Sequence, residues 1–329
     1  MLKKTTNPQI PHDPLYKQFF SYPQMVESLL RDFVPEDFVK DLDFSTMRRC
    51  FNTYVTKDRR ERRNDIVWRI KWKSDEWLYM TLILEFQSSP DPLMALRMLT
   101  YSGLLLTDTA KEQGPSMGLP AVFPVVIYNG EEPWKTPLGV TPMYGPMPLR
   151  SEFYCPHQNY FLLDKNFVPQ QQLQEKKGLV GILIRLERTY DPDIINVILE
   201  ELTPLLPGDF ALPLQELFLD LIDYRLTKAG IEGISKAKNI EEAHAMLKET
   251  YGTWKEKLIS QGQQKLLLKI LTNKFGLLPQ PVTAYIEKTP DVDEQSRLAY
   301  MAITSDSLEV FLDQLQTLPG YYTSIEKQN

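Results

Sequence analysis

The spacing of apolar residues predicts both helices and strands over the first 130 residues of the chain. Apolar residues recur at helical spacing over 12–35, where Pro23 divides the segment into two helices, and again over 93–113. Over 65–72, polar and apolar residues alternate, which is typical of a strand with one apolar face. The two periods together indicate a mixed α/β core.

Two longer apolar runs predict strands that are buried on both faces. One covers 77–86, and the other covers 120–130 and ends at an Asn-Gly pair. The polar residues 73–76 form a turn, so we expect 65–72 and 77–86 to pair as an antiparallel hairpin. A shorter alternation over 50–56 predicts one more strand.

The pattern changes after these strands. Residues 131–170 carry many prolines, which predicts an irregular excursion, and two helical stretches follow. The segment TPLLPGDF interrupts the pattern near residue 205, and beyond it the apolar spacing is helical. We therefore expect an α/β domain over 10–205 and an all-helical region over 206–329, with the character of an interaction module.

Composition and charge exclude several classes of site. Hydrophobic residues make up 43% of the 329 residues and charged residues 24%, which fits a globular protein with a sizeable core. The formal net charge of −6 argues against a wholly basic nucleic-acid-binding surface, although not against a local basic patch. Two cysteines and three histidines argue against a disulfide framework and a Cys-rich or His-based metal site. Because the sequence shows no signal peptide and no membrane span, we expect a cytoplasmic protein without a membrane partner.

The end of the apolar run 77–86 carries polar side chains that need a partner. Glu85 and Gln87 are two residues apart, so in a strand they project from the same face. In the expected hairpin, Asp65 at the start of the other strand lies beside them. Two neighbouring carboxylates repel each other unless a cation intervenes, and hard oxygen ligands suit Mg²⁺ or Mn²⁺. Because such a metal activates water and neutralises charge on a phosphodiester, these residues predict phosphate chemistry.

Basic and polar residues flank this predicted metal site on both sides in the sequence. Upstream, a cluster of arginines could track the backbone of a polyanion such as DNA through salt-dependent contacts; its central members are Arg59, Arg60, Arg62 and Arg63. Downstream, Arg97 and Tyr101 lie one helical turn apart, where they could contact a phosphate or orient the site.

Each of these groups also has an ordinary structural interpretation. Asp65 could cap a strand, Glu85 could form an ion pair with Arg97, and the arginine cluster could be a solvated loop. The joint arrangement of two carboxylates and an amide at one edge of a sheet favours a metal site over these separate roles.

Four segments in order resemble one known family over residues 10–205. The resemblance is to the recombination-promoting nucleases (Rpn), which are YhgA-like, transposase-like proteins of the PD-(D/E)XK superfamily; the segments are HDPLYKQFF, RRNDIVWRI, LILEFQSSPDPLMALRMLTY and PVVIYNGEEPW. It implies a restriction-endonuclease-like core, in which helices flank a central mixed sheet. It also implies a Mg²⁺-dependent DNA endonuclease, with Mn²⁺ as a substitute, that promotes DNA recombination or element mobility.

The resemblance assigns roles to individual residues. Asp65 and Glu85 match the two metal-binding carboxylates, and Gln87 occupies the position of the superfamily lysine. Asp13 and Lys17 match an N-terminal signature and are supporting candidates. Glutamine can only form hydrogen bonds, whereas lysine also brings a charge, so the attacking water would depend more on the metal.

A second function stays open beside the nuclease. A catalytically weak or inactive protein with a nuclease fold could act as a DNA- or protein-binding module, and the replacement of lysine by Gln87 favours this alternative. The retained pair Asp65 and Glu85 argues against it, because a retired site has no need of two neighbouring like charges. The helical tail resembles a module found after such nuclease domains, and a homodimer is a further option that the sequence leaves open.

Overall fold

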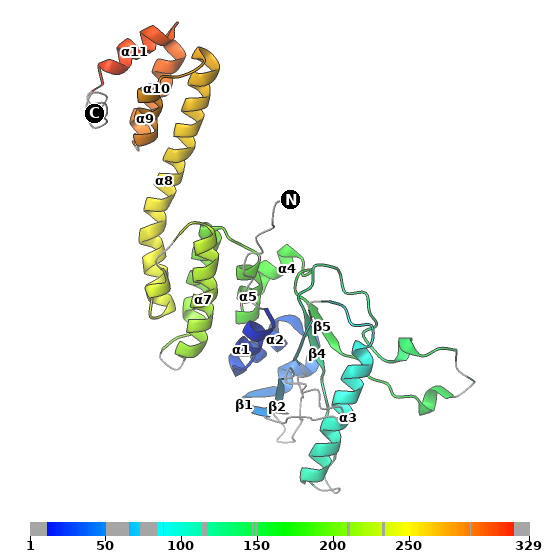
Figure 1. Cartoon of the computed structure of the whole chain (residues 1–329). Coiled ribbons are helices and arrows are strands. Elements are labelled where there is room, and N and C mark those ends of the chain that lie inside the picture. The colour runs from blue at the N-terminus through cyan, green and yellow to red at the C-terminus, as the bar shows by residue number, and fades with distance from the viewer. Residues whose placement is uncertain are drawn as a thin grey trace. The chain divides into compact units, whose positions relative to one another are not determined.

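We describe the fold from a computed structural model, which divides into two compact units (Figure 1). The first unit comprises 1–229 and 235–241, and the second comprises 230–234 and 242–329. Within these units the structure describes residues 12–50, 66–72, 84–87, 89–113, 118–146, 148, 151–208, 211–231, 234–289 and 291–318.

Two short helices begin the first unit. They are α1 (His12–Phe19) and α2 (Pro23–Phe33), followed by the 3₁₀ turn η1 (Asp37–Asp41). The predicted division at Pro23 is confirmed, because proline is tolerated only in the first turn of a helix and here it is the first residue of α2. Buried residues recur at helical spacing in α2, which gives the helix one fully covered face; they are Met25, Val26, Leu29 and Leu30.

An antiparallel pair of strands follows. Strand β1 (Leu42–Cys50) pairs with β2 (Val67–Trp72), and its register is interrupted by an irregularity between Asp43 and Arg48. The predicted strand 65–72 is therefore confirmed over β2, and β1 occupies residues where the apolar alternation gave no strand. The expected strand over 50–56 and the turn at 73–76 lie outside the described residues apart from Cys50.

Three parallel strands form the second sheet in the order β3-β4-β5. They are β3 (Leu84–Gln87), β4 (Val125–Tyr128) and β5 (Phe161–Asp164). All four residues of β4 are buried, as expected for the central strand of a parallel sheet. The predicted strands 77–86 and 120–130 are thus confirmed in part, over β3 and β4. The expected antiparallel pairing of 65–72 with 77–86 is wrong for the described strands, because β2 pairs with β1, whereas β3 pairs in parallel with β4 in the other sheet.

Strand β5 contradicts the prediction of an irregular segment over 131–170. It lies inside the segment 131–170, which the prolines led us to predict as irregular. The four-residue run FLLD is too short to show a period by itself, and pairing with β4 supplies the hydrogen bonds that make it a strand.

Helix α3 (Met94–Gln113) packs on the parallel sheet and confirms the predicted helix 93–113. Four residues on one face of α3 meet Val126 of β4 and Val140 and Tyr160 of the following loops in one apolar cluster; they are Met94, Ala95, Met98 and Tyr101. This packing places the N-terminal half of α3 against the central strand of the sheet.

Four more helices complete the first unit. They are α4 (Gln170–Glu175), α5 (Leu179–Glu187), α6 (Pro192–Leu202) and α7 (Leu212–Lys228), with short 3₁₀ turns at Thr141–Met143, Ser151–Tyr154 and Thr203–Leu205. A further 3₁₀ turn, Ile234–Lys236, spans the division between the two units. Helix α5 is apolar on nearly all sides and is buried, and it packs against α2. Asp191 caps α6 by accepting a hydrogen bond from the Asp193 amide.

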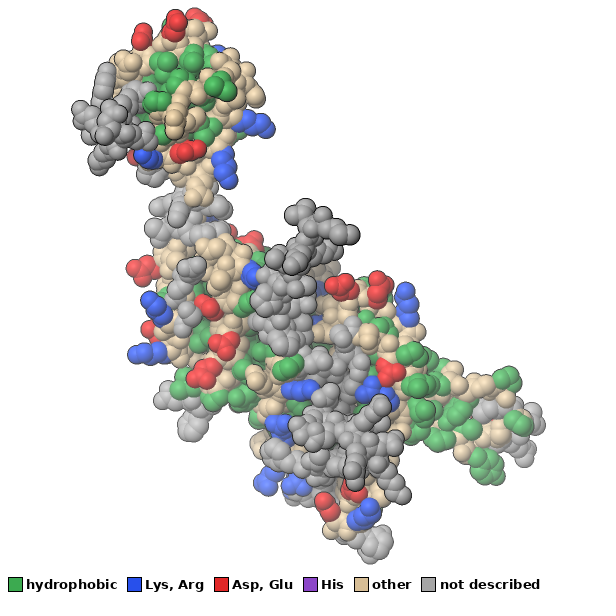
Figure 2. All heavy atoms as spheres, in the orientation of Figure 1, with side chains coloured by type: hydrophobic (Ala, Val, Ile, Leu, Met, Phe, Trp, Pro, Cys, Tyr) green, Lys and Arg blue, Asp and Glu red, His purple; other side chains and the backbone are tan. Residues whose placement is uncertain are grey.

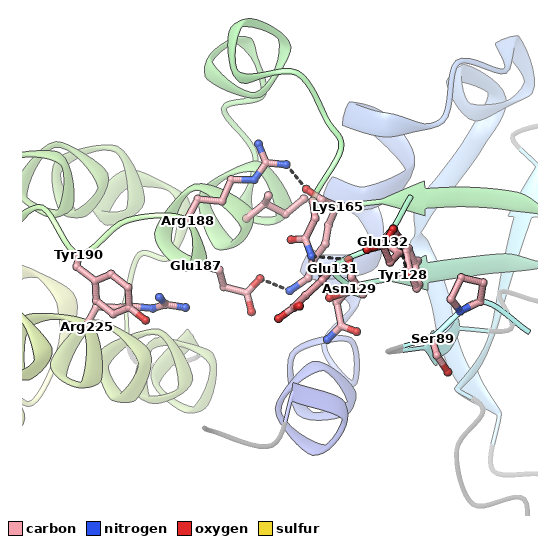
Figure 3. A pocket seen from close by; sticks show the side chains of 14 residues that line it. Ser89, Tyr128, Asn129, Glu131, Glu132, Lys165, Glu187, Arg188, Tyr190 and Arg225 are labelled. Carbon is pink, nitrogen blue, oxygen red and sulfur yellow. Dashed lines mark hydrogen bonds and ion pairs between the residues drawn. The ribbon is translucent and has the colours of Figure 1, made fainter. Parts of the chain in front are cut away.

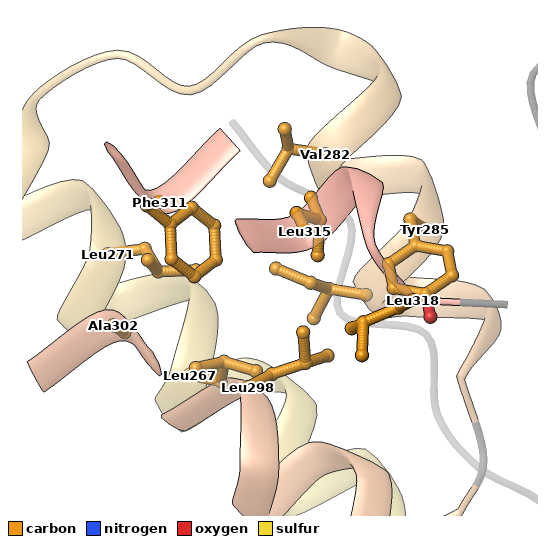
Figure 4. Packing of buried hydrophobic residues seen from close by; sticks show 10 residues of the cluster. Leu267, Leu271, Val282, Tyr285, Leu298, Ala302, Phe311, Leu315 and Leu318 are labelled. Carbon is orange, nitrogen blue, oxygen red and sulfur yellow. The ribbon is translucent and has the colours of Figure 1, made fainter. Parts of the chain in front are cut away.

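The second unit is helical throughout its described residues. It contains α8 (Ile240–Phe275) from Glu242 onward, α9 (Gln280–Lys288), α10 (Val292–Thr304) and α11 (Leu308–Gln316). Figure 4 shows the apolar core that these helices share; it includes Leu267, Leu271, Val282, Tyr285, Leu298, Phe311 and Leu315. The helical character predicted for the C-terminal part is confirmed.

The α/β class of the first unit is confirmed, in a chain that is mostly helical and has small sheets. The PD-(D/E)XK core and a domain boundary near residue 205 stay predictions; the compact units divide around residues 230–241. Within the described part of the chain, no helix has both the length and the apolar character to cross a membrane.

Candidate functional site at the carboxyl ends of the parallel strands

The three parallel strands end at the same edge of the sheet. Gln87, Tyr128 and Asp164 are in register, so the chain leaves all three strands beside one another. The residues that follow line a cavity of about 620 Å³, together with side chains from α5 and α7 (Figure 3). Open α/β sheets bind ligands at this edge, so the cavity is a candidate functional site on topological grounds.

A buried charged pair forms one wall of the cavity. The Lys165 ammonium follows β5 and lies 2.6 Å from a carboxylate oxygen of Glu187 at the end of α5. The two side chains are only 4% and 6% exposed. The Tyr16 hydroxyl from α1 donates a hydrogen bond to the same carboxylate and accepts one from Lys165 at 3.0 Å. Three distant elements therefore meet at a single ion pair.

The surroundings of this ion pair shift the pKa values of Lys165 and of the neighbouring Tyr16. Burial lowers the pKa of Lys165, although the Glu187 carboxylate opposes that shift. Burial also raises the pKa of Tyr16 well above its ordinary value, and Glu187 adds to the effect because it disfavours a second negative charge. Tyr16 therefore keeps its proton at neutral pH and acts as a hydrogen-bond donor to Glu187.

Two arginines add positive charge to the same cavity. Arg188 donates hydrogen bonds to the backbone carbonyls of Lys165 and Val168, the latter at 2.9 Å, and so ties α5 to the end of β5. Arg225 of α7 is 7% exposed, and its guanidinium lies 4.6 Å from the centre of the Tyr190 ring. Its Nε atom is buried and has no hydrogen-bond partner among the described residues.

Asparagines position the loop that follows β4. The Asn166 amide donates to the backbone carbonyls of Asn129 and Gly130 at 2.9 and 3.0 Å, and the Tyr128 hydroxyl donates to the Glu132 carbonyl at 2.7 Å. These bonds hold the Asn129 side chain on the strand side of the cavity (Figure 3). Its Oδ1 atom is buried and, within the described structure, has no hydrogen-bond partner.

A second polar cluster lies at the start of α3. Arg97 forms an ion pair with Asp91 at 2.7 Å and donates to the Tyr101 hydroxyl at 3.3 Å. Burial opposes ionisation of Asp91, but the hydrogen bonds from Arg97 and the Leu93 amide outweigh it and lower the pKa of Asp91. The predicted neighbours Arg97 and Tyr101 are thus in contact; their role in a site stays a prediction.

The predicted metal-binding residues are only partly within the described structure. Glu85 and Gln87 both belong to β3, in register with Val126 and Tyr128, and their spacing of two places both on one face of that strand. Their side chains lie outside the described residues, as does Asp65, which directly precedes the described Ile66. The meeting of Asp65 with Glu85 therefore stays a prediction.

The supporting candidates are also only partly within the described structure. Asp13 belongs to α1 without a described side chain, and Lys17 is half-buried in the last turn of that helix. The arginine cluster lies outside the described residues; its predicted members are Arg59, Arg60, Arg62 and Arg63. Among the side chains that the structure does describe, no group of three or more His, Cys, Asp or Glu could hold a metal ion.

Strands β1 and β2 carry further basic residues beside that cluster in the sequence. Arg48 lies directly across from Arg69 in the register, and Arg49 and Lys71 lie on the same two strands. Arg48 and Arg49 are exposed, and lysine and arginine side chains gather in this region of the surface (Figure 2). Like charges directly opposite each other repel, so this surface favours contact with an anion.

The charged cavity is not evident from the sequence. Lys165, Glu187 and Arg225 are far apart in the chain, and each follows or ends an apolar segment where a charge is expected at the surface. Tyr16 lies inside the segment HDPLYKQFF, which was noted for its neighbours Asp13 and Lys17. The one available signal was a carboxylate at the end of the apolar helix LVGILIRLE, where burial demands a partner.

Comparison with known proteins places the chain in a family. The family described as "Putative transposase, YhgA-like" matches residues 10–212, which is more than half of the chain. The chain belongs to this YhgA-like family. The family resemblance found in the sequence is therefore confirmed.

Curated relatives of this YhgA-like chain carry nuclease names. The inactive recombination-promoting nuclease-like protein RpnE of Escherichia coli (strain K12) is 26% identical over 80% of this chain and 86% of its own length. The recombination-promoting nuclease RpnA of the same strain is 23% identical over 79% of this chain and 87% of its own length. The recombination-promoting nuclease RpnD of Escherichia coli O157:H7 is 28% identical over 38% of this chain and 48% of its own length. No solved structure matches the chain.

Proposed function

We propose that this protein is a metal-dependent DNA endonuclease that promotes DNA recombination or element mobility. Asp65 and Glu85 would bind Mg²⁺, for which Mn²⁺ can substitute, and Gln87 would align the attacking water by hydrogen bonding. When bound, the metal supplies a Lewis acid and lowers the pKa of its water. Names of relatives support the class of activity, since RpnA is called a recombination-promoting nuclease.

One observation of the structure carries the proposal. Glu85 and Gln87 share one face of β3, and that strand ends at the sheet edge where the candidate cavity lies. The Glu85 carboxylate is a hard oxygen donor of the type that Mg²⁺ prefers, and Gln87 on the same strand face would be placed to hydrogen-bond a water on that metal. The protein would supply the remaining carboxylate from Asp65.

The basic strands β1 and β2 support DNA as the partner. Arg48, Arg49, Arg69 and Lys71 would neutralise phosphates, and the arginine cluster 57–63 would extend that contact. Such contacts are independent of base sequence, so binding would weaken steeply as salt rises. A homodimer would bring two such surfaces together for a double-strand cut; sedimentation of the purified protein with and without DNA tests this assembly.

A second function has its own support. RpnE, which is 26% identical over 80% of this chain, is named inactive, and Gln87 replaces a charged lysine with a neutral amide. A protein that binds DNA or a partner without cutting fits both observations. The two functions differ in whether Asp65 and Glu85 are needed for turnover.

The deciding experiment is plasmid cleavage by the purified protein with Mg²⁺, Mn²⁺, Ca²⁺ or EDTA. We expect nicking or linearisation with Mg²⁺ or Mn²⁺, and a loss of about 100-fold or more in Asp65→Ala and in Glu85→Ala. Glu36→Ala, which removes an exposed carboxylate from the same unit, serves as the matched control and should cut like the wild type. A folded wild type that binds DNA but cuts with none of these metals would establish the non-catalytic alternative.

A further inference from the structure

The cavity at the sheet edge is lined by three cations, Lys165, Arg188 and Arg225, and by three carboxylates, Glu131, Glu132 and Glu187. Lys165 is paired with Glu187, and Arg188 bonds backbone carbonyls and lies near Asp164. No acidic side chain in the described structure forms an ion pair with Arg225. Lys165, Arg188 and Arg225 all line this one cavity, and Arg225 and Arg188 oppose the protonated form of Lys165 while Glu187 favours it.

A buried guanidinium donor without an acceptor is costly, because it loses its hydration without a compensating hydrogen bond. The Nε atom of Arg225 is a buried donor without an acceptor, and its side chain is 7% exposed. Figure 3 shows Arg225 and Glu187 directed into the cavity from the helices, with Asn129 facing them from the strand side. An anionic ligand would supply the hydrogen-bond acceptor that Arg225 lacks.

A hydrogen-bond acceptor in the same cavity narrows the range of possible ligands further. The buried Asn129 Oδ1 has no partner in the described structure, so a ligand that fills the cavity must also bring a donor. The volume of about 620 Å³ falls in the range of small-molecule sites and exceeds the space that a single ion needs. A nucleotide meets all three requirements, because it combines a phosphate with sugar hydroxyls and base amino groups.

We propose that this cavity binds the phosphate ester of a nucleotide, with Arg225 contacting the phosphate and Asn129 accepting a hydrogen bond from the sugar or base. The ligand is either a free nucleotide or the phosphorylated end of a nucleic acid, which share this chemistry. Glu131 and Glu132 also line the cavity, and because both side chains are exposed, solvent screens their charge. This inference goes beyond the proposed cleavage reaction and does not require the residues Asp65 and Glu85.

Calorimetric titration of the full chain in EDTA tests the proposal, because EDTA removes any contribution of a divalent metal. The probes are deoxynucleoside 5′-monophosphates, the corresponding nucleosides, inorganic phosphate, acetate, and duplex oligonucleotides with and without 5′-phosphate. We expect monophosphates to bind and nucleosides and acetate not to bind. Preference for the 5′-phosphorylated duplex over the free nucleotide would identify a nucleic-acid end, and the reverse would identify a free nucleotide.

Matched variants locate the site. Arg225→Gln should weaken monophosphate binding by roughly tenfold or more, because it removes a charge-assisted contact. Lys228→Gln removes the same charge from an exposed position of the same helix and should bind like the wild type. Asn129→Asp, which keeps the shape of the side chain and adds a negative charge, should weaken binding in the same direction even if Arg225→Gln does not fold.

Two results would overturn the proposal. One is a folded wild type that binds no phosphate-bearing probe at millimolar concentration. The other is monophosphate binding that is equally strong in wild type and in folded Arg225→Gln and Asn129→Asp. Loss of plasmid cleavage in Asp65→Ala with retained nucleotide binding would separate this site from the cleavage reaction, so either proposal can fail alone.

Discussion

At the scale of single residues, the most consequential feature is the buried group formed by Tyr16, Lys165 and Glu187. Each member satisfies another, and each would be costly if it were left alone away from water. The ion pair links the end of β5 to the end of α5, and the tyrosine links both to α1. The position of these three elements therefore depends on one network of charges.

Replacement of Lys165 by methionine should destabilise the first unit by about 3 kcal/mol or more, because Glu187 then remains buried without its cation. The double variant Lys165→Met with Glu187→Leu should recover most of that loss, since it replaces both charges by apolar side chains. Urea unfolding of the three proteins measures the difference. Equal stability of the single and double variants would show that the carboxylate does not need the lysine.

The ion pairs of Glu201 make stability depend on pH. The hydrogen bond from Arg185 lowers the pKa of Glu201 below its ordinary value of 4.5, and a second bond from Lys177 at 2.8 Å adds to this effect although burial opposes it. A carboxyl whose folded pKa is lowered contributes stability above its unfolded pKa and loses it as pH falls through the folded pKa. The contribution is therefore complete at pH 7 and declines below about pH 4.5.

Glu201→Gln should consequently lower stability at pH 7 by about 1–2 kcal/mol and have progressively less effect below about pH 4.5. Melting temperatures of wild type and variant across pH 3–7 measure the convergence. A difference that stays constant over this range would contradict the assignment.

At the scale of elements, helix α5 is the centre of the first unit and approaches its neighbours closely. It packs against α2, where the Ser28 hydroxyl accepts a hydrogen bond from the Val180 amide at 2.9 Å. At Gly181, an added Cβ would lie 2.2 Å from the Lys176 backbone oxygen. The small residue therefore allows the preceding chain to fold back over the first turn of the helix.

Two glycine-to-alanine variants should have opposite effects. Gly181→Ala should destabilise the protein by about 1–3 kcal/mol, because the clash is with backbone that cannot rotate away. Gly103→Ala in α3 meets nothing within 4 Å and should stabilise by about 0.5–1 kcal/mol through reduced chain entropy. Denaturant unfolding compares the two, and a stabilising Gly181→Ala would show that the turn before α5 relaxes easily.

The elements also show how far a sequence can be interpreted. Long periodic segments such as α3, and runs buried on both faces such as β4, were predictable because local pattern determines them. Strand β5 was not, because a four-residue strand acquires its identity from the neighbour with which it pairs. The charged cavity was not predictable either, since Tyr16, Lys165 and Arg225 meet only through tertiary packing. In the predicted metal site, pattern placed Glu85 and Gln87 together on one strand, and their partnership with Asp65 stays a prediction.

At the scale of the whole molecule, the chain contains two compact units with separate apolar cores. In the first unit, Phe19 and Phe218 pack edge to face with ring centres 4.8 Å apart. In the second unit, Phe311 is fully buried in a cluster formed by residues of that unit alone. Each core therefore has its own contribution to stability.

Core truncations should act on one unit at a time. Phe311→Ala should lower the stability of the second unit by about 3–5 kcal/mol, and Phe218→Ala should do the same to the first. Four of the five tryptophans lie before residue 230, so fluorescence reports mainly on the first unit, whereas circular dichroism reports on both. A single unfolding transition that both variants shift equally would show that the units unfold together.

The residues of the cavity wall and those of the proposed cutting site are synthesised at different times. Synthesis proceeds from the N-terminus, so the strand with Glu85 and Gln87 leaves the ribosome well before α7. Arg225 lies beyond residue 212, where the family match ends, and is the last charged residue of the cavity to emerge. A nascent chain would therefore hold its proposed cutting residues for some time before its proposed phosphate pocket is complete. Release of a truncated product at that stage would yield a protein with the family motifs and an unfinished cavity.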